Sequence, residues 1–376
     1  MRPVFAIATH MLTGMGNTTD AHWEGVCAGK TGIQQYTDTT LDAAPFMASR
    51  IAPPQWQAIQ AQTRSQQQLF PFEQLTAYSA CKALEELETP LHLNDTVFIL
   101  ATTKGNIELL GDVPNERLTL YGSAQRIATH LGIAAKPVVI SHACVSGVIA
   151  LQHAARLLCS GQYKHAIVTG CDRFSRFVLS GFRSFQAISD EPCRPFDAAR
   201  KGVTLGEGAG TIILSTQHTG SPQAQLLSGA TSNDANHISG PSRTGEELAS
   251  SITRALGSAG ITPSQVGLIS AHGTATVYND EMESKAFDVA GLLHTPVHSF
   301  KGYIGHTLGA AGVLESIMIL ESMKHQTLIP SAGFEDLGVP KALNITRALQ
   351  PATINYALKT ASGFGGCNAV LVWGKG

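Results

Sequence analysis

A cysteine and two histidines lie where apolar segments end in glycine-containing turns. Cys144 follows the apolar run at 137–140 and comes directly before an amphipathic helical pattern. His272, in SAHGTATVYND, and His306, in SFKGYIGHTLGAAG, each stand beside a glycine after an apolar segment. The start of a helix favours negative charge and lowers the pKa of a cysteine from about 8.5. We therefore expect Cys144 to be a nucleophile that forms a thiolate, with the two histidines as a paired site.

Other kinds of site could use the same residue types. A metal site would need a further acidic or thiolate ligand at close spacing, and Asp280 and Glu283 are the available carboxylates. Neither stands out, so we predict no metal. A cysteine hydrolase could use Cys144 with one histidine, but it would leave the second histidine and the neighbouring lysine unused. The run Gly29-Lys30-Thr31 resembles a phosphate-binding loop, whose pattern requires glycine where this chain has Glu24.

The composition limits the class of protein. Of the 376 residues, 43% are apolar and only 14% are charged, whereas about a quarter is usual for charged residues. We expect a large core and a surface that is partly buried against another subunit. The net charge of −2 indicates no basic surface for nucleic acid.

The seven cysteines form no C-x-x-C pair, which argues against a zinc site or a disulfide framework. No apolar run approaches the ~18 residues of a membrane span. No secretory signal is visible, so we expect no membrane span and a cytoplasmic location.

Short apolar runs alternate with longer helical patterns, which predicts an α/β fold. Strands are predicted at 4–8, 96–101, 137–141, 165–170, 210–214, 266–271, 295–300 and 369–374. Helices are predicted at 74–88, 147–158, 245–258 and 310–325.

The chain also repeats itself. Glycine-rich turns that run into apolar strands occur at 206–214 and at 363–372, and each follows a strand–turn–helix segment. We predict two similar halves, residues 1–216 and 217–376, with the divide near 217–223. Since each half places a polar group at the same kind of helix start, these groups should lie close together around a pseudo-twofold axis.

These motifs resemble those of the β-ketoacyl-acyl-carrier-protein synthases, which have the thiolase fold. The resemblance rests on HACVSG around Cys144, HGTAT from His272 and KGYIGHTLGAAG from Lys301. It extends over nearly the whole chain, through GKTGI at 29–33, CRPFDAARKGVTLGEGAG at 193–210, SNDANHIS at 232–239 and GFGGCNA at 363–369. It implies two similar halves in a layered αβαβα arrangement. It also implies a decarboxylative condensation in type II fatty acid or polyketide synthesis.

The resemblance assigns a role to each catalytic residue. Cys144 would take the acyl chain from a carrier-protein thioester. His272 and His306 would decarboxylate the malonyl extender and stabilise the enolate. Lys301 would orient this pair, with Glu315 as its acidic partner on the following helix.

The resemblance also implies how the substrate is bound. Thr274 and Thr276 would hold the phosphopantetheine arm. The backbone N–H groups of Cys144 and Phe364 would form the oxyanion hole, and Phe364 would gate the acyl pocket. No cofactor is expected, because the substrates are carried on the phosphopantetheine of the acyl carrier protein.

Two kinds of partner follow from the resemblance. Arg200 and Lys201 would contact the acidic carrier protein near the tunnel mouth. The second partner is a copy of the chain or a second ketosynthase-like subunit, giving a homodimer or a heterodimer. Residues 103–121 are expected near the neighbouring subunit.

The chain departs from the family pattern in several places. His142 and Val145 flank the cysteine, and Val203 replaces an aromatic residue of the central motif. The interval between Gly105 and Cys144 is short in the part that normally lines the acyl pocket. The alternative function is therefore a subunit like a chain-length factor, as in polyene pigment synthesis. Such a subunit shapes the pocket of a partner ketosynthase without condensing, and the presence of Cys144 favours an enzyme instead.

Overall fold

The computed structural model describes residues 2–64, 69–217, 224–236 and 238–376. Its central sheet has eleven strands. The strands of the first half are β1 (Phe5–Thr13), β4 (Thr96–Ala101), β5 (Val138–Ile140), β6 (His165–Asp172) and β8 (Gly208–Ser215). The strands of the second half are β9 (Ala224–Asn233), β10 (Leu268–Ser270), β11 (Pro296–His298), β13 (Asn344–Ile345), β15 (Tyr356–Gly363) and β16 (Cys367–Lys375).

The order of the strands repeats between the halves. The first half reads β5-β4-β6-β8-β1, and the second reads β11-β10-β15-β16-β9 with β13 added at the edge beside β11. In both halves the first three strands are parallel, and the last two pair antiparallel. The halves join through a short antiparallel pairing of β1 with β9. The predicted dividing segment 217–223 lies outside the described residues except for Gln217.

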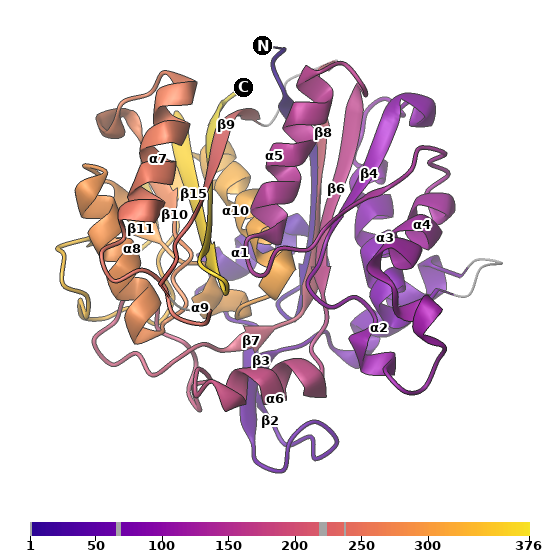
Figure 1. Cartoon of the computed structure of the whole chain (residues 1–376), viewed down its shortest axis with the longest axis horizontal. Helices are drawn as coiled ribbons and strands as arrows, with labels where there is room; N and C mark the ends of the chain where they lie inside the picture. Colours follow the sequence, from indigo (N-terminus) through magenta and orange to yellow (C-terminus); the bar gives the residue numbers. More distant parts are fainter. Residues whose placement is uncertain (1, 65–68, 218–223, 237) are drawn as a thin grey trace.

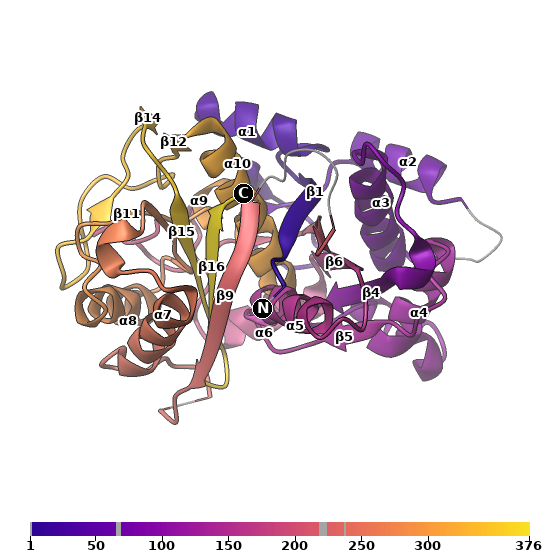
Figure 2. The ribbon, with the colours of Figure 1, turned by 90° about the horizontal axis from the view of Figure 1, so that it is seen from above.

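Helices form three layers around the two half-sheets (Figures 1 and 2). The central layer holds α5 (Ser146–Cys159) and α10 (Ala311–His325), which contact strands of both halves. The outer layers hold α3 (Pro71–Glu85) and α4 (Leu120–His130) on one side, and α7 (Glu246–Ala259) and α8 (Val277–Val289) on the other. The predicted αβαβα arrangement is confirmed.

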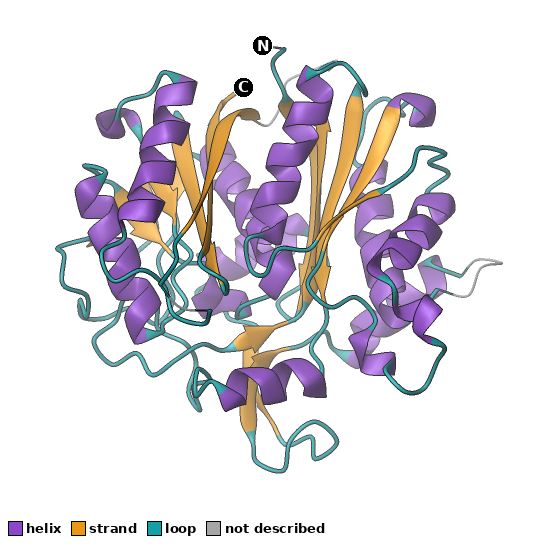
Figure 3. Cartoon of the chain, in the orientation of Figure 1, coloured by secondary structure: helices purple, strands orange, loops and turns teal. Residues whose placement is uncertain are grey.

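Smaller elements connect these layers or lie below them (Figures 1 and 3). The further α-helices are α1 (Thr19–Cys27), α2 (Pro53–Gln62), α6 (Arg176–Ser184) and α9 (Lys301–Ile304). Two small sheets contain β2 (Ile33–Tyr36), β3 (Phe46–Ser49) and β7 (Leu205–Gly206), and β12 (Thr327–Leu328) with β14 (Gln350–Pro351). Short 3₁₀ turns span Leu93–Asp95, Ile107–Leu109, Asn115–Leu118, Pro263–Gln265 and Leu308–Ala310.

The sequences of the central elements explain their burial. The strands β4 and β6 are buried along their whole length, as expected for continuous apolar runs covered by helices on both faces. The helix α10 is buried from Ala311 to Met323, because it lies between two sheets. Its sequence is accordingly apolar on most of its circumference rather than along one stripe.

All predicted strands and helices are present with shifted ends, but two long strands were not predicted. The strands β9 and β15 contain small and polar residues, AQLLSGATSN and YALKTASG, without a clear apolar run. The strand β5 is only partly buried because it lies at the edge of the sheet. Among the described residues, no helix combines the length and apolar character that a membrane crossing would require.

Candidate active site

Cys144 lies in the turn between β5 and α5. The hydroxyl of Ser146 accepts a hydrogen bond from the His142 N–H at 2.8 Å and donates one to the Ala143 carbonyl at 2.6 Å, which closes the turn. Ala143 has a φ of 46°, a left-handed conformation that a non-glycine residue adopts only when its surroundings enforce it. The turn therefore has a strained backbone at Ala143, directly before Cys144.

The glycine-rich turn at 363–366 approaches the nucleophile closely. A Cβ on Gly363 would lie 3.1 Å from the Cys144 backbone nitrogen. The absence of a side chain at Gly363 allows the two backbones to meet. Phe364 follows directly and lines the same cavity as Cys144. This proximity is compatible with the predicted oxyanion hole of the Cys144 and Phe364 N–H groups, which stays a prediction.

His306 lies beside the nucleophile. The start of the glycine-rich turn at 206–214 and the residues just before it hold its backbone: the His306 N–H donates to the Thr204 carbonyl at 2.7 Å, and the Gly206 N–H donates to the His306 carbonyl at 3.0 Å. The His306 Nε2 lies 3.0 Å from the Cys144 Sγ. Burial lowers the pKa of His306 well below its usual value, and the ammonium of Lys301 lowers it further. The ring is neutral at pH 7, so it can accept or donate a single proton.

His272 follows β10 and completes the pair. Its N–H donates to Glu283 at 2.8 Å, and the Gly273 N–H donates to the other Glu283 oxygen at 2.6 Å. The two imidazole rings are 5.2 Å apart and nearly perpendicular. Burial also lowers the pKa of His272 well below its usual value, with a further contribution from Lys301.

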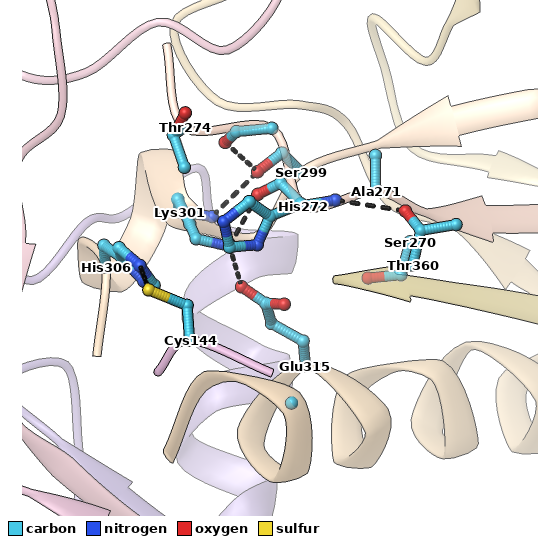
Figure 4. Close-up of polar contacts among 12 residues, drawn as sticks. Cys144, Ser270, Ala271, His272, Thr274, Ser299, Lys301, His306, Glu315 and Thr360 are labelled. Atoms are coloured by element: carbon cyan, nitrogen blue, oxygen red, sulfur yellow. Dashed lines mark hydrogen bonds and ion pairs between the residues drawn. The ribbon is translucent and has the colours of Figure 1, made fainter. Parts of the chain in front are cut away.

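Lys301 and Glu315 form a buried ion pair behind the histidines (Figure 4). The Lys301 Nζ lies 2.5 Å from Glu315 Oε1 and donates to the His272 carbonyl at 2.5 Å. It also lies 3.4 Å from the His272 Nδ1. An ammonium can only donate, so His272 accepts at Nδ1 and carries its hydrogen on Nε2. The structure thus brings together all five residues of the predicted catalytic set, which include Cys144 and His306.

Three residues of this set lie at a cavity of about 460 Å³. Cys144, His272 and His306 line it, as do Thr274 and Thr276, whose hydroxyls are 2.8 Å apart. Phe182, on the short helix α6, also lines this cavity, and no motif or spacing in the sequence singles it out. Its ring stacks on Phe364 at 5.6 Å and meets the His306 ring edge-on at 6.5 Å.

Two sequence-based expectations are wrong. Burial raises the pKa of the Cys144 thiol to about 12. In the resting site this effect exceeds the lowering of the pKa by the Lys301 ammonium, so the side chain is a thiol there. Arg200 is also not an exposed docking residue, because it is 9% exposed and donates to the carbonyls of Asp197 and Gly338. Lys201 is exposed at the cavity mouth and pairs with Glu191 at 2.6 Å.

The structure also shows what the possible metal ligands contact. The two carboxylates considered from the sequence accept backbone N–H groups instead, Asp280 from Phe196 and Thr274 and Glu283 from the His272 segment. Within the described part of the chain, Cys144, His272 and His306 place ligand atoms within 4.8 Å of one another. The nearby ammonium disfavours a cation among them. The absence of a metal stays a prediction.

The positions that depart from the family pattern form contacts of their own. His142 lies 2.8 Å, through Nε2, from the Sγ of Cys367. Val145 is fully buried at the start of α5, and Val203 lines the cavity. The contacts of His142, Val145 and Val203 are compatible with the arrangement of the five catalytic residues described above.

Comparison with known proteins places this site in context. Residues 1–219 match the family described as beta-ketoacyl synthase, N-terminal domain, and residues 224–335 match its C-terminal domain. The 3-oxoacyl-[acyl-carrier-protein] synthase 2 of Vibrio cholerae is 28% identical over 99% of both chains. The enzyme of the same name from Vibrio harveyi is 32% identical over 65% of this chain and 63% of its own length.

Solved structures share the fold over the whole chain. The ishigamide ketosynthase/chain length factor is 24% identical with a TM-score of 0.88, covering 100% of this chain and 99% of the other. A beta-ketoacyl synthase from Burkholderia phymatum is 22% identical with a TM-score of 0.89, covering 100% of both chains.

Proposed function

The chain belongs to the beta-ketoacyl synthase family, and from that premise we propose that it condenses a malonyl-acyl-carrier-protein extender with an acyl chain held on Cys144. The reaction is a decarboxylative Claisen condensation in type II fatty acid or polyketide synthesis. The observation that carries the proposal is the 3.0 Å contact between the His306 Nε2 and the Cys144 Sγ, beside the second imidazole.

The first step transfers the acyl chain to the enzyme. The Cys144 Sγ attacks the carbonyl carbon of the acyl thioester while the thiol proton passes to the His306 Nε2. The bond from the carbonyl carbon to the pantetheine sulfur then breaks, and this sulfur takes the proton from His306. A base is needed because burial raises the pKa of Cys144 to about 12. One preorganised N–H donor to the oxyanion is worth about 10²–10³ in rate.

The second step releases CO₂ from the malonyl thioester. The bond to the carboxylate breaks, and its electron pair forms an enolate whose oxygen needs hydrogen-bond donors. Since His272 carries its hydrogen on Nε2, this nitrogen can donate to the enolate. His306 can donate beside it from Nε2 in its other neutral tautomer, because no thiol proton faces that nitrogen once Cys144 is acylated. The enolate carbon then attacks the acyl carbonyl on Cys144, and the bond from this carbon to the Cys144 Sγ breaks to give the 3-oxoacyl thioester. The departing thiolate takes up one proton from solvent, which restores the resting thiol.

We propose that the substrates arrive on an acyl carrier protein. The hydroxyls of Thr274 and Thr276 line the 460 Å³ cavity and suit the amides of a pantetheine arm. Lys201, exposed at the mouth, is the remaining candidate for docking an acidic carrier. We further propose that the protein is cytoplasmic and acts as a homodimer or a heterodimer with a second ketosynthase-like subunit. No further cofactor is required by these steps.

The second candidate is a subunit like a chain-length factor. The short interval before Cys144 favours it, because that interval lines the acyl pocket in the family. Such a subunit would shape the pocket of a partner ketosynthase and would not use its own thiol. The two candidates therefore differ in whether Cys144 is acylated.

The experiment combines the purified chain with acyl and malonyl carrier proteins. We expect an acyl adduct on Cys144 by mass spectrometry and formation of a 3-oxoacyl product. Cys144→Ala should lose both but still release CO₂, whereas Cys171→Ala, which alters a buried cysteine away from the cavity, should retain all three activities. If Cys144→Ala leaves a mixed complex with a second ketosynthase fully active, the chain-length-factor function is correct instead.

A further inference from the structure

A second buried lysine lies behind the imidazole pair. Lys359, in the middle of β15, is 0% exposed, and its Nζ lies 2.7 Å from Glu315 Oε2. The other Glu315 oxygen pairs with Lys301 at 2.5 Å. One carboxylate thus lies between two ammonium groups, and the cluster of Lys301, Glu315 and Lys359 has a net positive charge.

The same two ammonium groups hold the chain that leads into His272. Lys359 Nζ donates to the carbonyls of Ser270 at 3.1 Å and Ala271 at 3.4 Å, and Lys301 Nζ donates to the His272 carbonyl at 2.5 Å. Three consecutive carbonyls at the end of β10 are therefore bound by the two lysines (Figure 4 shows the position of this segment). Lys359 reaches them because β10 and β15 pair in parallel with Ser270 opposite Lys359.

The free-energy cost of burying an ammonium group argues against a purely space-filling role for Lys359. Burying a charge is unfavourable unless it is paired and hydrogen-bonded, and Glu315 already has Lys301 as a partner. Burial lowers the pKa of Lys359, and Glu315 opposes this effect. The ionisable groups around it are Glu315 on α10, Lys301 on α9, Glu283 on α8, His298 on β11, and the His272–His306 pair.

We propose that Lys359 is a positioning residue for decarboxylation, which fixes His272 through the end of β10 and supplies a second positive charge beside the imidazole pair. This inference rests on the proposed function. The fixed backbone keeps His272 aimed at the enolate, and the charge favours neutral rings and an anionic enolate. Acylation of Cys144 depends on His306 and not on the position of His272, so it should depend less on Lys359.

Two variants separate the hydrogen bonds of Lys359 from its charge. Lys359→Met removes both at similar length, whereas Lys359→Gln keeps a donor for the carbonyls and removes only the charge. Lys359→Arg keeps the charge. Lys285→Met is the control, because Lys285 is on the surface of α8 and donates to a backbone carbonyl.

The measurements are Cys144 acylation and CO₂ release from malonyl carrier protein between pH 5 and 8. With Lys359→Met we expect CO₂ release to fall at least 30-fold, while acylation falls less than threefold. With Lys359→Gln the loss should be smaller, but an acid limb should appear at higher pH than in the wild type, because a removed positive charge makes the rings easier to protonate. Lys359→Arg should keep the wild-type acid limb.

A proportional loss of acylation and CO₂ release, or unchanged activity and pH profile in both neutral variants, would overturn the proposal. If Lys359→Met does not fold, Lys359→Gln and Lys359→Arg still decide the question. Nitrogen-15 NMR of the imidazole rings reads their protonation without turnover. If the wild type neither acylates nor releases CO₂, the proposed function fails, while ring signals that respond to Lys359→Gln would still support the placement of Lys359.

Discussion

Gly147 of α5 and Gly312 of α10 meet where the two central helices cross. A Cβ on Gly312 would lie 2.5 Å from the Val148 nitrogen, and a Cβ on Gly147 would lie 2.8 Å from the Val313 nitrogen. These helices begin just after Cys144 and His306, respectively. The close crossing therefore brings the nucleophile of one half to the base of the other.

Replacing Gly147 with alanine should destabilise the protein although alanine is the better helix former. The new methyl group would overlap the backbone of α10, and overpacking of this kind costs about 1–3 kcal/mol. In a urea unfolding titration we expect a lower free energy of unfolding and slower acylation of Cys144, because the helix starts move apart.

The matched control is Gly257→Ala in α7, where a Cβ would meet nothing within 4 Å. This change should stabilise the protein by about 0.5–1 kcal/mol, since glycine is the poorer residue in a helix. If both variants were equally stable, the crossing would not depend on the small size of Gly147.

Without the His306 imidazole, the rate of Cys144 acylation should depend on the hydroxide concentration. Because the Cys144 pKa is about 12, the thiolate fraction without a base rises about tenfold for each pH unit up to that value. His306→Ala should therefore acylate slowly at pH 7 and recover steadily towards pH 10, while the wild type changes little. Rapid-quench mass spectrometry measures both rates, and His325→Ala, an exposed histidine on α10, is the control.

The contrary result would be a pH profile of acylation that is the same in His306→Ala and in the wild type. It would mean that Cys144 ionises by another route. Release of CO₂ from malonyl carrier protein should be lost in His306→Ala at every pH, because raised pH does not replace a hydrogen-bond donor.

Part of the site could be predicted from the sequence, because residue types suited to catalysis stand at positions in the chain that are also suited to it. Cys144 and His306 each stand between an apolar strand and a helix, and such a junction can be recognised in a sequence. Lys301 and Glu315 follow from the resemblance to the family. The α/β class follows from the same alternation of strands and helices, and the two similar halves follow from the internal repeat. The layered αβαβα arrangement follows from the resemblance to the family.

The other features of the site depend on side-chain packing, which the spacing of residues along the sequence does not reveal. Lys359 was not predicted because a lysine within ALKTAS looks like a residue of an exposed strand, whereas β15 is covered on both faces. The resemblance to the family puts the loop of Arg200 near the tunnel mouth, but the guanidinium is buried and donates to the carbonyls of Asp197 and Gly338. The pKa of Cys144 was misjudged because burial is a property of the folded chain.

His298 should lower the free energy of unfolding of the protein at acid pH. Both of its ring nitrogens are buried and have no hydrogen-bond partner among the residues that the structure describes, and burial lowers its pKa to about 3. The unfolded chain binds the proton at the ordinary value of 6.5. Stability from this group is therefore complete above pH 6.5 and is lost as the pH falls towards 3, by about 1.4 kcal/mol per pH unit.

His298→Leu should remove this dependence without loss of stability at pH 7, because an apolar side chain of similar size leaves no unpaired polar atom. Urea titrations at pH 7 and pH 5 give the comparison, in which the other titrating groups are common to both proteins. Equal slopes against pH would show that His298 does not stay neutral in the folded protein.

The last prediction separates two neighbouring cations. Lys201 has a side chain that is 61% exposed, whereas that of Arg200 is 4% exposed. Lys201→Glu should raise the KM for a carrier-bound substrate several-fold and leave kcat unchanged, because attraction between exposed charges acts on the encounter. With a small pantetheine thioester the KM should stay the same. Arg200→Ala should instead lower the free energy of unfolding by about 1–3 kcal/mol, because the carbonyls of Asp197 and Gly338 lose the hydrogen bonds of the guanidinium. Its KM should rise equally for both substrates or for neither. An equal rise in KM for both substrates with Lys201→Glu would exclude Lys201 from carrier docking and place the contact elsewhere on the rim of the cavity.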